Sequence, residues 1–133
     1  MYGASIGIKP QNSSKLRAKV KKGFSISAFR RLRKKLGISE KDLAILLNIP
    51  VSTLSRRKKQ GKLNSDESDK LLRIARIYDQ ALEVFGDPEL SRKWLQEPAF
   101  ALGDIPPLQY ADTEIGAQEV MDLLGRIQHG VFS

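Results

Sequence analysis

The feature that most constrains the fold is a series of six segments with apolar residues at helical spacing, each followed closely by glycine or proline. The segments span residues 27–36, 40–47, 51–59, 65–85, 88–95 and 114–129, and the residues that follow them are Gly37, Pro50, Gly61, Gly86, Pro98 and Gly130. Apolar residues at this spacing share one side of an α-helix, whereas glycine and proline are typical of helix ends. The sequence therefore predicts an all-α protein.

Residues 24–64 contain the first three of these helices and form the first predicted lobe. Ser39 is expected to cap the second helix, because its hydroxyl can accept a hydrogen bond from an unpaired amide. Asn48, Ile49 and Pro50 predict a tight turn, since proline cannot continue one helix but tolerates the start of the next. A helix, a short turn and another helix in this order are typical of a helix-turn-helix that binds DNA.

Charge is divided unevenly between the two halves of the chain. Residues 1–62 contain seventeen Lys or Arg and two acidic residues, whereas residues 63–133 contain six Lys or Arg and thirteen acidic residues. The formal net charge of the whole chain is +8. Because DNA is a polyanion, a basic half that contains a helix-turn-helix indicates DNA binding. The acidic half must bind something else.

The third helix of the first lobe has Leu54 as its single strong core residue. Turning Leu54 inward places Ser52, Arg56 and Lys59 outermost, because successive residues are about 100° apart around the helix. Arg56 can bond guanine in two places, whereas Arg57, Lys58 and Lys62 are expected to contact phosphates. The predicted DNA-binding residues are Ser52, Thr53, Ser55, Arg56, Arg57, Lys58, Lys59 and Lys62. A merely solvated basic face is the alternative interpretation.

Two further segments flank this lobe. Residues 1–23 predict a mobile basic arm with at most a short helix over residues 16–20, which either binds DNA or only aids solubility. Residues 65–86 predict a long connecting helix that Ser65 caps. Its apolar stripe either fills the core or pairs with a second copy, and a homodimer is expected because such modules commonly bind symmetric operators in pairs.

Residues 87–133 form the second predicted lobe. Asp87 and Pro88 have the features of a helix start, and Trp94 is expected to anchor the core behind them. Residues 99–111 predict an irregular loop packed by Phe100, Leu102, Leu108 and Tyr110. Asp112 or Thr113 is then expected to cap the final helix.

Three residues of the C-terminal region leave alternatives open. Gly116 is costly inside a helix, so it indicates that something approaches closely there. His129 can complement the C-terminus of the helix as a cation, or it can act at the active site of a partner. Phe132 follows the helix-ending Gly130 and either folds back or anchors a partner protein.

Composition excludes several kinds of site. The chain has no Cys and one His, which excludes disulfides and thiolate metal sites. We find no nucleophile paired with a base and no glycine loop for phosphates, so we expect no catalytic residue, cofactor or metal. The longest uncharged run, residues 43–55, is shorter than the ~20 residues that span a bilayer. We expect a cytoplasmic protein without a membrane partner.

Two groups of motifs indicate a family. The first lobe contains Leu36-Gly37-Ile38-Ser39, the run IPVSTLSRR over residues 49–57, and Gly61-Lys62-Leu63. The second contains EVFGD over residues 83–87, Trp94-Leu95, Ala101-Leu102-Gly103, TEIGA over residues 113–117, and LGRIQHGVF over residues 124–132. Residues 23–132 thereby resemble an Xre-type antitoxin with a C-terminal toxin-binding domain, a family also described by the names MbcA and ParS.

This resemblance implies a function. It implies that the chain neutralises a toxin encoded beside it, most often a RES-domain enzyme that destroys NAD, and that the helix-turn-helix represses their shared promoter. It also implies that the C-terminal helix and tail lie near the NAD cleft of the toxin. The expected toxin-binding residues are Gly116, Val120, Arg126, His129, Gly130, Val131 and Phe132. The alternative is a free-standing transcriptional regulator with a protein-binding C-terminal domain.

Overall fold

The structure is a computed structural model that describes residues 4–7 and 12–130. Its elements are η1 (Ala4–Ile6), α1 (Ser13–Lys22), α2 (Ile26–Leu36), α3 (Glu40–Leu46), α4 (Val51–Gln60), α5 (Ser65–Phe85), α6 (Pro88–Gln96), η2 (Phe100–Leu102), α7 (Pro107–Tyr110) and α8 (Glu114–Gln128). Over the described residues, β-type pairing consists of two isolated bridges, Ser25 with Lys62 and Ala99 with Ile105. The all-α prediction is confirmed.

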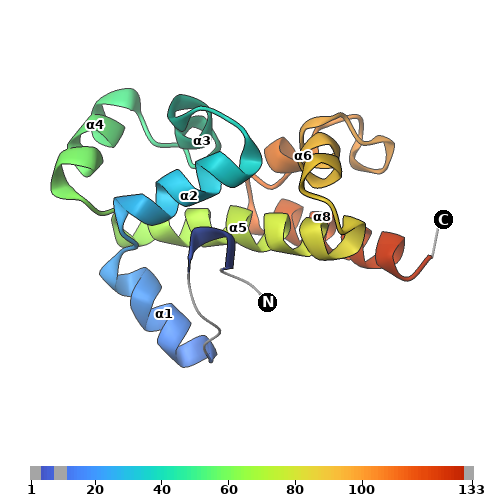
Figure 1. The fold of residues 1–133 in the computed structure, drawn as a ribbon, viewed down its shortest axis with the longest axis horizontal. Coiled ribbons are helices and arrows are strands. Elements are labelled where there is room, and N and C mark those ends of the chain that lie inside the picture. Colours follow the sequence, from blue (N-terminus) through green and yellow to red (C-terminus); the bar gives the residue numbers. More distant parts are fainter. Residues whose placement is uncertain (1–3, 8–11, 131–133) are drawn as a thin grey trace.

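Helix α5 is the scaffold of the molecule. It is 21 residues long, and α2, α3 and α4 lie over one of its ends while α6, α7 and α8 lie at the other (Figure 1). It packs against α1, α2 and η1 as well as against α6 and α8. Leu71, Ala75 and Ala81 are fully buried along it. The buried apolar residues of both lobes form one continuous core. Each fully buried Leu in that core stabilises the fold by about 1.5–3 kcal/mol.

Helices α2, α3 and α4 form the predicted helix-turn-helix. The Ser39 hydroxyl accepts a hydrogen bond from the Asp42 N–H at 3.0 Å, as expected of an N-cap. Asn48 adopts a φ of 57° in the turn, a conformation that asparagine tolerates better than most residues. Leu43 and Leu54 face the core. The unit is therefore held by a cap, a turn and two apolar faces that the sequence indicated.

The start of α5 differs from the prediction, because its N-cap is Asn64 and not Ser65. Asn64 Oδ1 accepts the Glu67 N–H at 2.8 Å, and Glu67 Oε1 accepts the Asn64 N–H at 2.9 Å. This reciprocal capping box needs Glu or Gln three residues after the cap. Only Asn64 has one, since the residue three after Ser65 is Ser68, whose hydroxyl accepts the Phe24 N–H at 2.8 Å.

The described part of the N-terminal arm is more structured than expected. Helix α1 spans residues 13–22 and packs on α5, whereas only a short helix over residues 16–20 was predicted. In η1, Ile6 is 3% exposed and the Ser5 hydroxyl donates to the Ala75 carbonyl at 3.4 Å. These contacts place η1 against α2 and α5. Mobility of the arm stays a prediction.

The second lobe begins as predicted. The Asp87 carboxylate accepts the Leu90 N–H at 2.8 Å, with Pro88 as the first helical residue. Leu95 is fully buried, whereas Trp94 is half-buried and packs against Phe85 with ring centroids 5.6 Å apart. Leu95 is therefore the centre of this part of the core, and Trp94 covers its side.

The expected packing of the loop over residues 99–111 is wrong for Phe100, whose side chain is 92% exposed. Residues 100–102 form a single 3-10 turn. Because a 3-10 helix has about three residues per turn, its successive side chains point in three directions and only one of them faces the core. Leu102 takes that place at 4% exposure, and Leu108 in α7 packs beside it with the same exposure. The final helix then begins at Thr113, whose hydroxyl accepts the Gly116 N–H at 3.0 Å.

Candidate DNA-binding and toxin-binding surfaces

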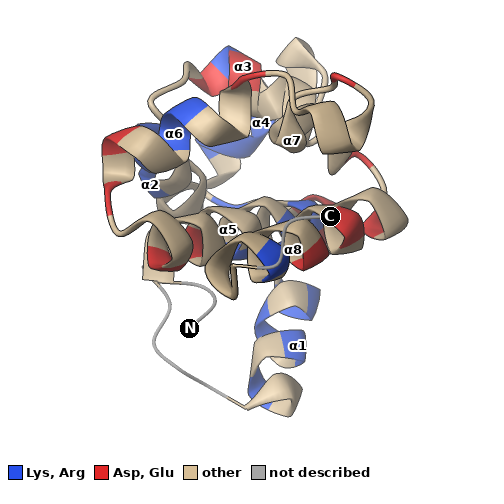
Figure 2. Cartoon of the chain, turned by 90° about the vertical axis from the view of Figure 1, so that its right-hand side faces the viewer, with Lys and Arg blue, Asp and Glu red and all other residues tan. Residues whose placement is uncertain are grey.

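Helix α4 presents most of its predicted DNA-binding residues outward. Ser52, Ser55, Arg56 and Lys59 are exposed, and Thr53 is half-exposed. Leu54 is 7% exposed and fixes the rotation of the helix about its axis. Figure 2 shows Lys and Arg on α2 and α4. Hydroxyls near the start of α4 and cations near its end can contact base edges and phosphates, respectively.

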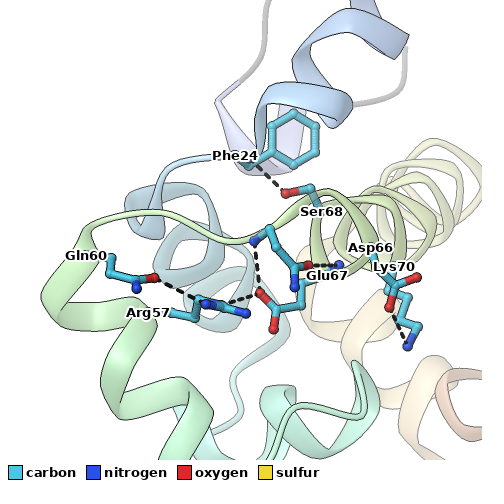
Figure 3. A network of polar contacts seen from close by, with 8 residues as sticks. Phe24, Arg57, Gln60, Asp66, Glu67, Ser68 and Lys70 are labelled. Atoms are coloured by element: carbon cyan, nitrogen blue, oxygen red, sulfur yellow. Dashed lines mark hydrogen bonds and ion pairs between the residues drawn. The ribbon is translucent and has the colours of Figure 1, made fainter.

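Arg57 has a structural role that the sequence did not indicate. Its Nε donates to Glu67 Oε1 at 2.7 Å, and its Nη1 donates to Gln60 Oε1 at 3.2 Å (Figure 3). The side chains of Arg57 and Glu67 are only 15% and 9% exposed. Arg57 therefore ties the end of α4 to the capping box of α5 and fixes the orientation of the recognition helix. Its Nε and Nη1 are thus engaged within the protein, and the phosphate contact of Arg57 stays a prediction.

Lys58 is also paired. Its Nζ donates to Glu40 Oε1 at 2.8 Å, and Arg30 Nε donates to Glu40 Oε2 at 3.2 Å. The hydrogen bond from Lys58 is the main cause that lowers the pKa of Glu40 below its usual 4.5; Arg30 adds to this, while partial burial opposes it. Glu40 is therefore ionised at neutral pH and links α2, α3 and α4.

Three of the cations predicted to contact DNA form no ion pair within the described residues. Within residues 4–7 and 12–130, Arg56, Lys59 and Lys62 have no carboxylate within ion-pair distance. All three are exposed. They are the cations of the predicted set that can engage phosphate or base edges without breaking an existing bond.

At the other end of the molecule, α8 buries two of the predicted toxin contacts. Val120 is fully buried, and Gly116 is buried as well. A side chain at Gly116 would collide with the Tyr110 carbonyl of α7. The close approach indicated by this glycine is thus made by the chain itself. Val120 presents no side chain to a partner, which corrects its assignment as a direct contact, whereas Gly116 lines an open cleft and its assignment stays a prediction.

The remaining predicted toxin contacts lie at the C-terminal end of α8. Arg126, His129 and Gly130 are exposed there, and His129 is the C-cap residue. A cation in the last turn of a helix is stabilised by the unpaired carbonyls. Val131 and Phe132 lie outside the described residues.

An exposed apolar surface in the C-terminal lobe was missed from the sequence. Ile105 and Ile115, 41% and 76% exposed, line an open cleft of about 450 Å³ together with Tyr110 and Glu119. Phe100 belongs to the same loop as Ile105, one residue beyond Ala99 and its bridge to Ile105. We call Ile105 and Ile115, which both line this cleft, the apolar face. Grouped exposed apolar residues are typical of interaction surfaces.

One signal could have found this surface. Ile115 lies off the stripe of Gly116, Val120 and Leu124 that faces the core, at a position where helical periodicity favours a polar residue. Beside it, the Tyr110 hydroxyl donates to Glu119 Oε2 at 2.6 Å, and this bond raises the pKa of Tyr110 above its usual 10.0. The apolar face is therefore bordered by a carboxylate held in place.

The two lobes are also bonded directly. Gln96 Nε2 in α6 donates to the Leu36 carbonyl at 3.0 Å, and Arg92 Nη1 donates to the Lys35 carbonyl at 3.5 Å. These carbonyls belong to the last turn of α2, where no amide of the helix is available to them. Helix α6 therefore caps the C-terminal end of α2.

Two kinds of feature are absent from residues 4–7 and 12–130. None of the helices in this part of the chain is long and apolar enough to cross a membrane. Over the same residues, no three His, Asp or Glu side chains form a group that could hold a metal ion.

Comparisons with known proteins match two domains along the chain. Residues 15–76 match the antitoxin Xre-like helix-turn-helix domain, and residues 80–130 match the antitoxin Xre/MbcA/ParS C-terminal toxin-binding domain. The Prs ADP-ribosylating antitoxin of a Sphingobium species is 27% identical over 124 residues, which cover 86% of this chain and 78% of that protein.

Two relatives match nearly the whole chain. The antitoxin Xre of Yersinia enterocolitica is 33% identical over 130 residues, which cover 96% of this chain and 88% of the relative. The antitoxin Xre of Photorhabdus laumondii is 30% identical over 131 residues, which cover 97% and 88%, respectively. With both domains matched and both lobes present in the fold, the chain belongs to the family of Xre antitoxins that carry a C-terminal toxin-binding domain.

Proposed function

We propose that this type II antitoxin inhibits a RES-domain, NAD-degrading toxin through its C-terminal lobe and represses its own operon through α4. The observation that carries the proposal is the presence of two chemically different exposed surfaces on different elements, one on α4 and one beside α7 and the start of α8. One surface contains the unpaired cations Arg56, Lys59 and Lys62, and the other contains the apolar face. A single chain can then bind a polyanion and a protein without competition for the same residues.

Operator binding is proposed to involve two copies of the chain. One recognition helix reads few base pairs, and a second copy on a symmetric site doubles the contacts. Arg56 would donate two hydrogen bonds to a guanine, and Lys59 and Lys62 would contact the phosphates beside it. Arg57 would act indirectly, by keeping α4 in position through Glu67.

Toxin inhibition is proposed to be steric and to need no catalytic group of this chain. The apolar face would supply the desolvated centre of the interface, where binding energy usually concentrates. Arg126, His129 and Gly130, with Val131 and Phe132 after them, would extend from α8 toward the NAD cleft of the toxin. Val120, which is fully buried, would contribute only by holding α8 in place.

Co-expression with the neighbouring gene tests the proposal. The full chain should restore growth that the neighbouring gene product arrests, and Arg56→Ala should restore growth equally well. A chain that ends at residue 129 should lose protection but keep DNA binding. Growth arrest that persists with the full chain present, or a neighbouring gene without toxicity, would refute toxin inhibition.

A further inference from the structure

A cationic cleft lies beside the recognition helix, and Lys58 is the one cation of its lining that belongs to the predicted set of DNA contacts. It is open, has a volume of about 830 Å³, and lies between α2, the start of α3 and the side of α4. Its lining includes Arg30 and Lys34 from α2, Lys41 from α3 and Lys58 from α4. Three helices that are separate in the sequence thus direct positive charge to one place.

Six cations line the cleft, and they differ in their partners. Arg30 and Lys58 both bond to Glu40, which also lines the cleft. Lys34 and Lys41 are exposed, and over the described part of the chain neither has a carboxylate partner. The cleft therefore holds two unpaired ammonium groups and two cations that share one carboxylate, and Arg31 and Arg33 also line it. Its net charge is strongly positive, a state that an anion would relieve.

The position of the cleft suits a DNA backbone. Lys58 is three residues after Ser55, so the two side chains are neighbours on the surface of α4. A helix is about 10–12 Å wide and the major groove about 12 Å, so a helix seated in the groove brings its flanking elements against the phosphates at the groove edge. With Ser55 toward the bases, α2 and the start of α3 are such flanking elements.

We propose that this cleft binds a backbone phosphate through Lys34 and Lys41, and that Glu40 weakens DNA binding by competing with that phosphate for Arg30 and Lys58. The inference rests on the proposed binding of DNA by α4. Glu40 then has two roles: it joins three helices in the free protein, and it limits the attraction to DNA of any sequence. Removal of its charge would release two cations toward the backbone.

The test is DNA binding by purified full-length variants, measured by fluorescence anisotropy across a range of salt concentrations. The probes are a duplex from the region upstream of the gene and a duplex of random sequence. Each released counterion contributes about 0.9 to the slope of log affinity against log salt. Lys34→Gln and Lys41→Gln should each reduce the slope by about that amount, which is roughly a fivefold weaker affinity at about 0.15 M salt, on both duplexes.

Glu40→Gln should have the opposite effect, with tighter binding and a steeper slope. Glu114→Gln is its matched control, because Glu114 also follows a hydroxyl N-cap, begins a helix and accepts from an arginine Nε at 3.2 Å, far from α4. Lys93→Gln in α6 is the control for loss of one exposed cation. Thermal melting of each variant reports whether it folds.

The outcomes separate this inference from the proposed function. If wild type binds and the slopes of Lys34→Gln and Lys41→Gln equal that of Lys93→Gln, the cleft is not a phosphate site. If Glu40→Gln binds no tighter than Glu114→Gln, the competing role is wrong. If wild type binds neither duplex, operator binding itself fails, and the cleft fails with it.

Discussion

The two ends of α5 use charge in opposite ways. At the helix-turn-helix end, the exposed groups are mainly cations, and the carboxylates Glu40 and Glu67 tie helices together. At the C-terminal end, the exposed groups include many acids, and Arg73 and Arg92 make ties between helices, to Glu114 and to the carbonyl of Lys35. In each lobe, residues of the minority charge thus tie helices together.

The comparison also shows why the two surfaces can share one core. Attraction to DNA acts over a Debye length and needs many positive charges rather than precise fit. A protein interface depends on a few well-packed apolar side chains from which water is excluded. The positive charges and the exposed apolar side chains both lie at the surface of the molecule. The buried leucines and alanines of α5 can therefore support both lobes.

The largest expected change in the free energy of unfolding comes from substitutions in the core, and these substitutions test whether the two lobes unfold as one unit. Leu43→Ala at one end and Leu124→Ala at the other remove fully buried side chains. Each should lower the free energy of unfolding by about 2–5 kcal/mol, from lost burial and the cavity left behind. Urea unfolding followed by circular dichroism and by Trp94 fluorescence should show one transition that moves as a whole. Two separate transitions would mean that each lobe has its own core.

A smaller effect is expected at the end of the recognition helix. Arg57→Gln leaves the Glu67 carboxylate shielded without its cation, and should lower the free energy of unfolding by about 2–3 kcal/mol. Lys59→Gln, at an exposed and unpaired position, should change it by less than about 0.5 kcal/mol. Equal effects of the two substitutions in urea unfolding would remove the structural role of Arg57.

The smallest effect concerns pH. Because the folded-state pKa of Glu40 lies below 4.5, its ion pairs stabilise the protein above that pH, and this contribution is lost as the pH falls through the folded pKa. At neutral pH, wild type should exceed Glu40→Gln in unfolding free energy by less than about 1 kcal/mol, because the pairs are partly exposed. The difference should vanish in acid. A difference that persists there would show that Glu40 stabilises the fold by something other than its charge.

Much of the fold was predictable because its signals are local. Caps at Ser39 and Asp87 act within one turn of their own helices, and the rotation of α4 follows from Leu54 alone. The choice between Asn64 and Ser65 also had a local answer, in the position of Glu67. The order and approximate bounds of α2 to α6 and of α8 were therefore available from the chain itself, whereas α7 and the full length of α1 were not predicted.

The candidate sites were less predictable, because they depend on which helices meet. Arg57 differs from its neighbours only in having Glu67 within reach, and Glu67 belongs to the next helix. Val120 and Ile115 both belong to α8, and the packing of α5 and α7 decides which is buried. Phe100 follows no helical period, so its exposure was set by Leu102 taking the place beside the core.

We propose that DNA and toxin bind at separate surfaces of this protein. The most direct test is calorimetry of full-length Arg56→Ala and Ile115→Asp with the upstream duplex and with the purified product of the neighbouring gene. Arg56→Ala should lose about 1–3 kcal/mol on the duplex and nothing on the toxin. Ile115→Asp should lose about 2 kcal/mol or more on the toxin and nothing on the duplex. Either substitution weakening both partners to a similar extent would contradict the claim.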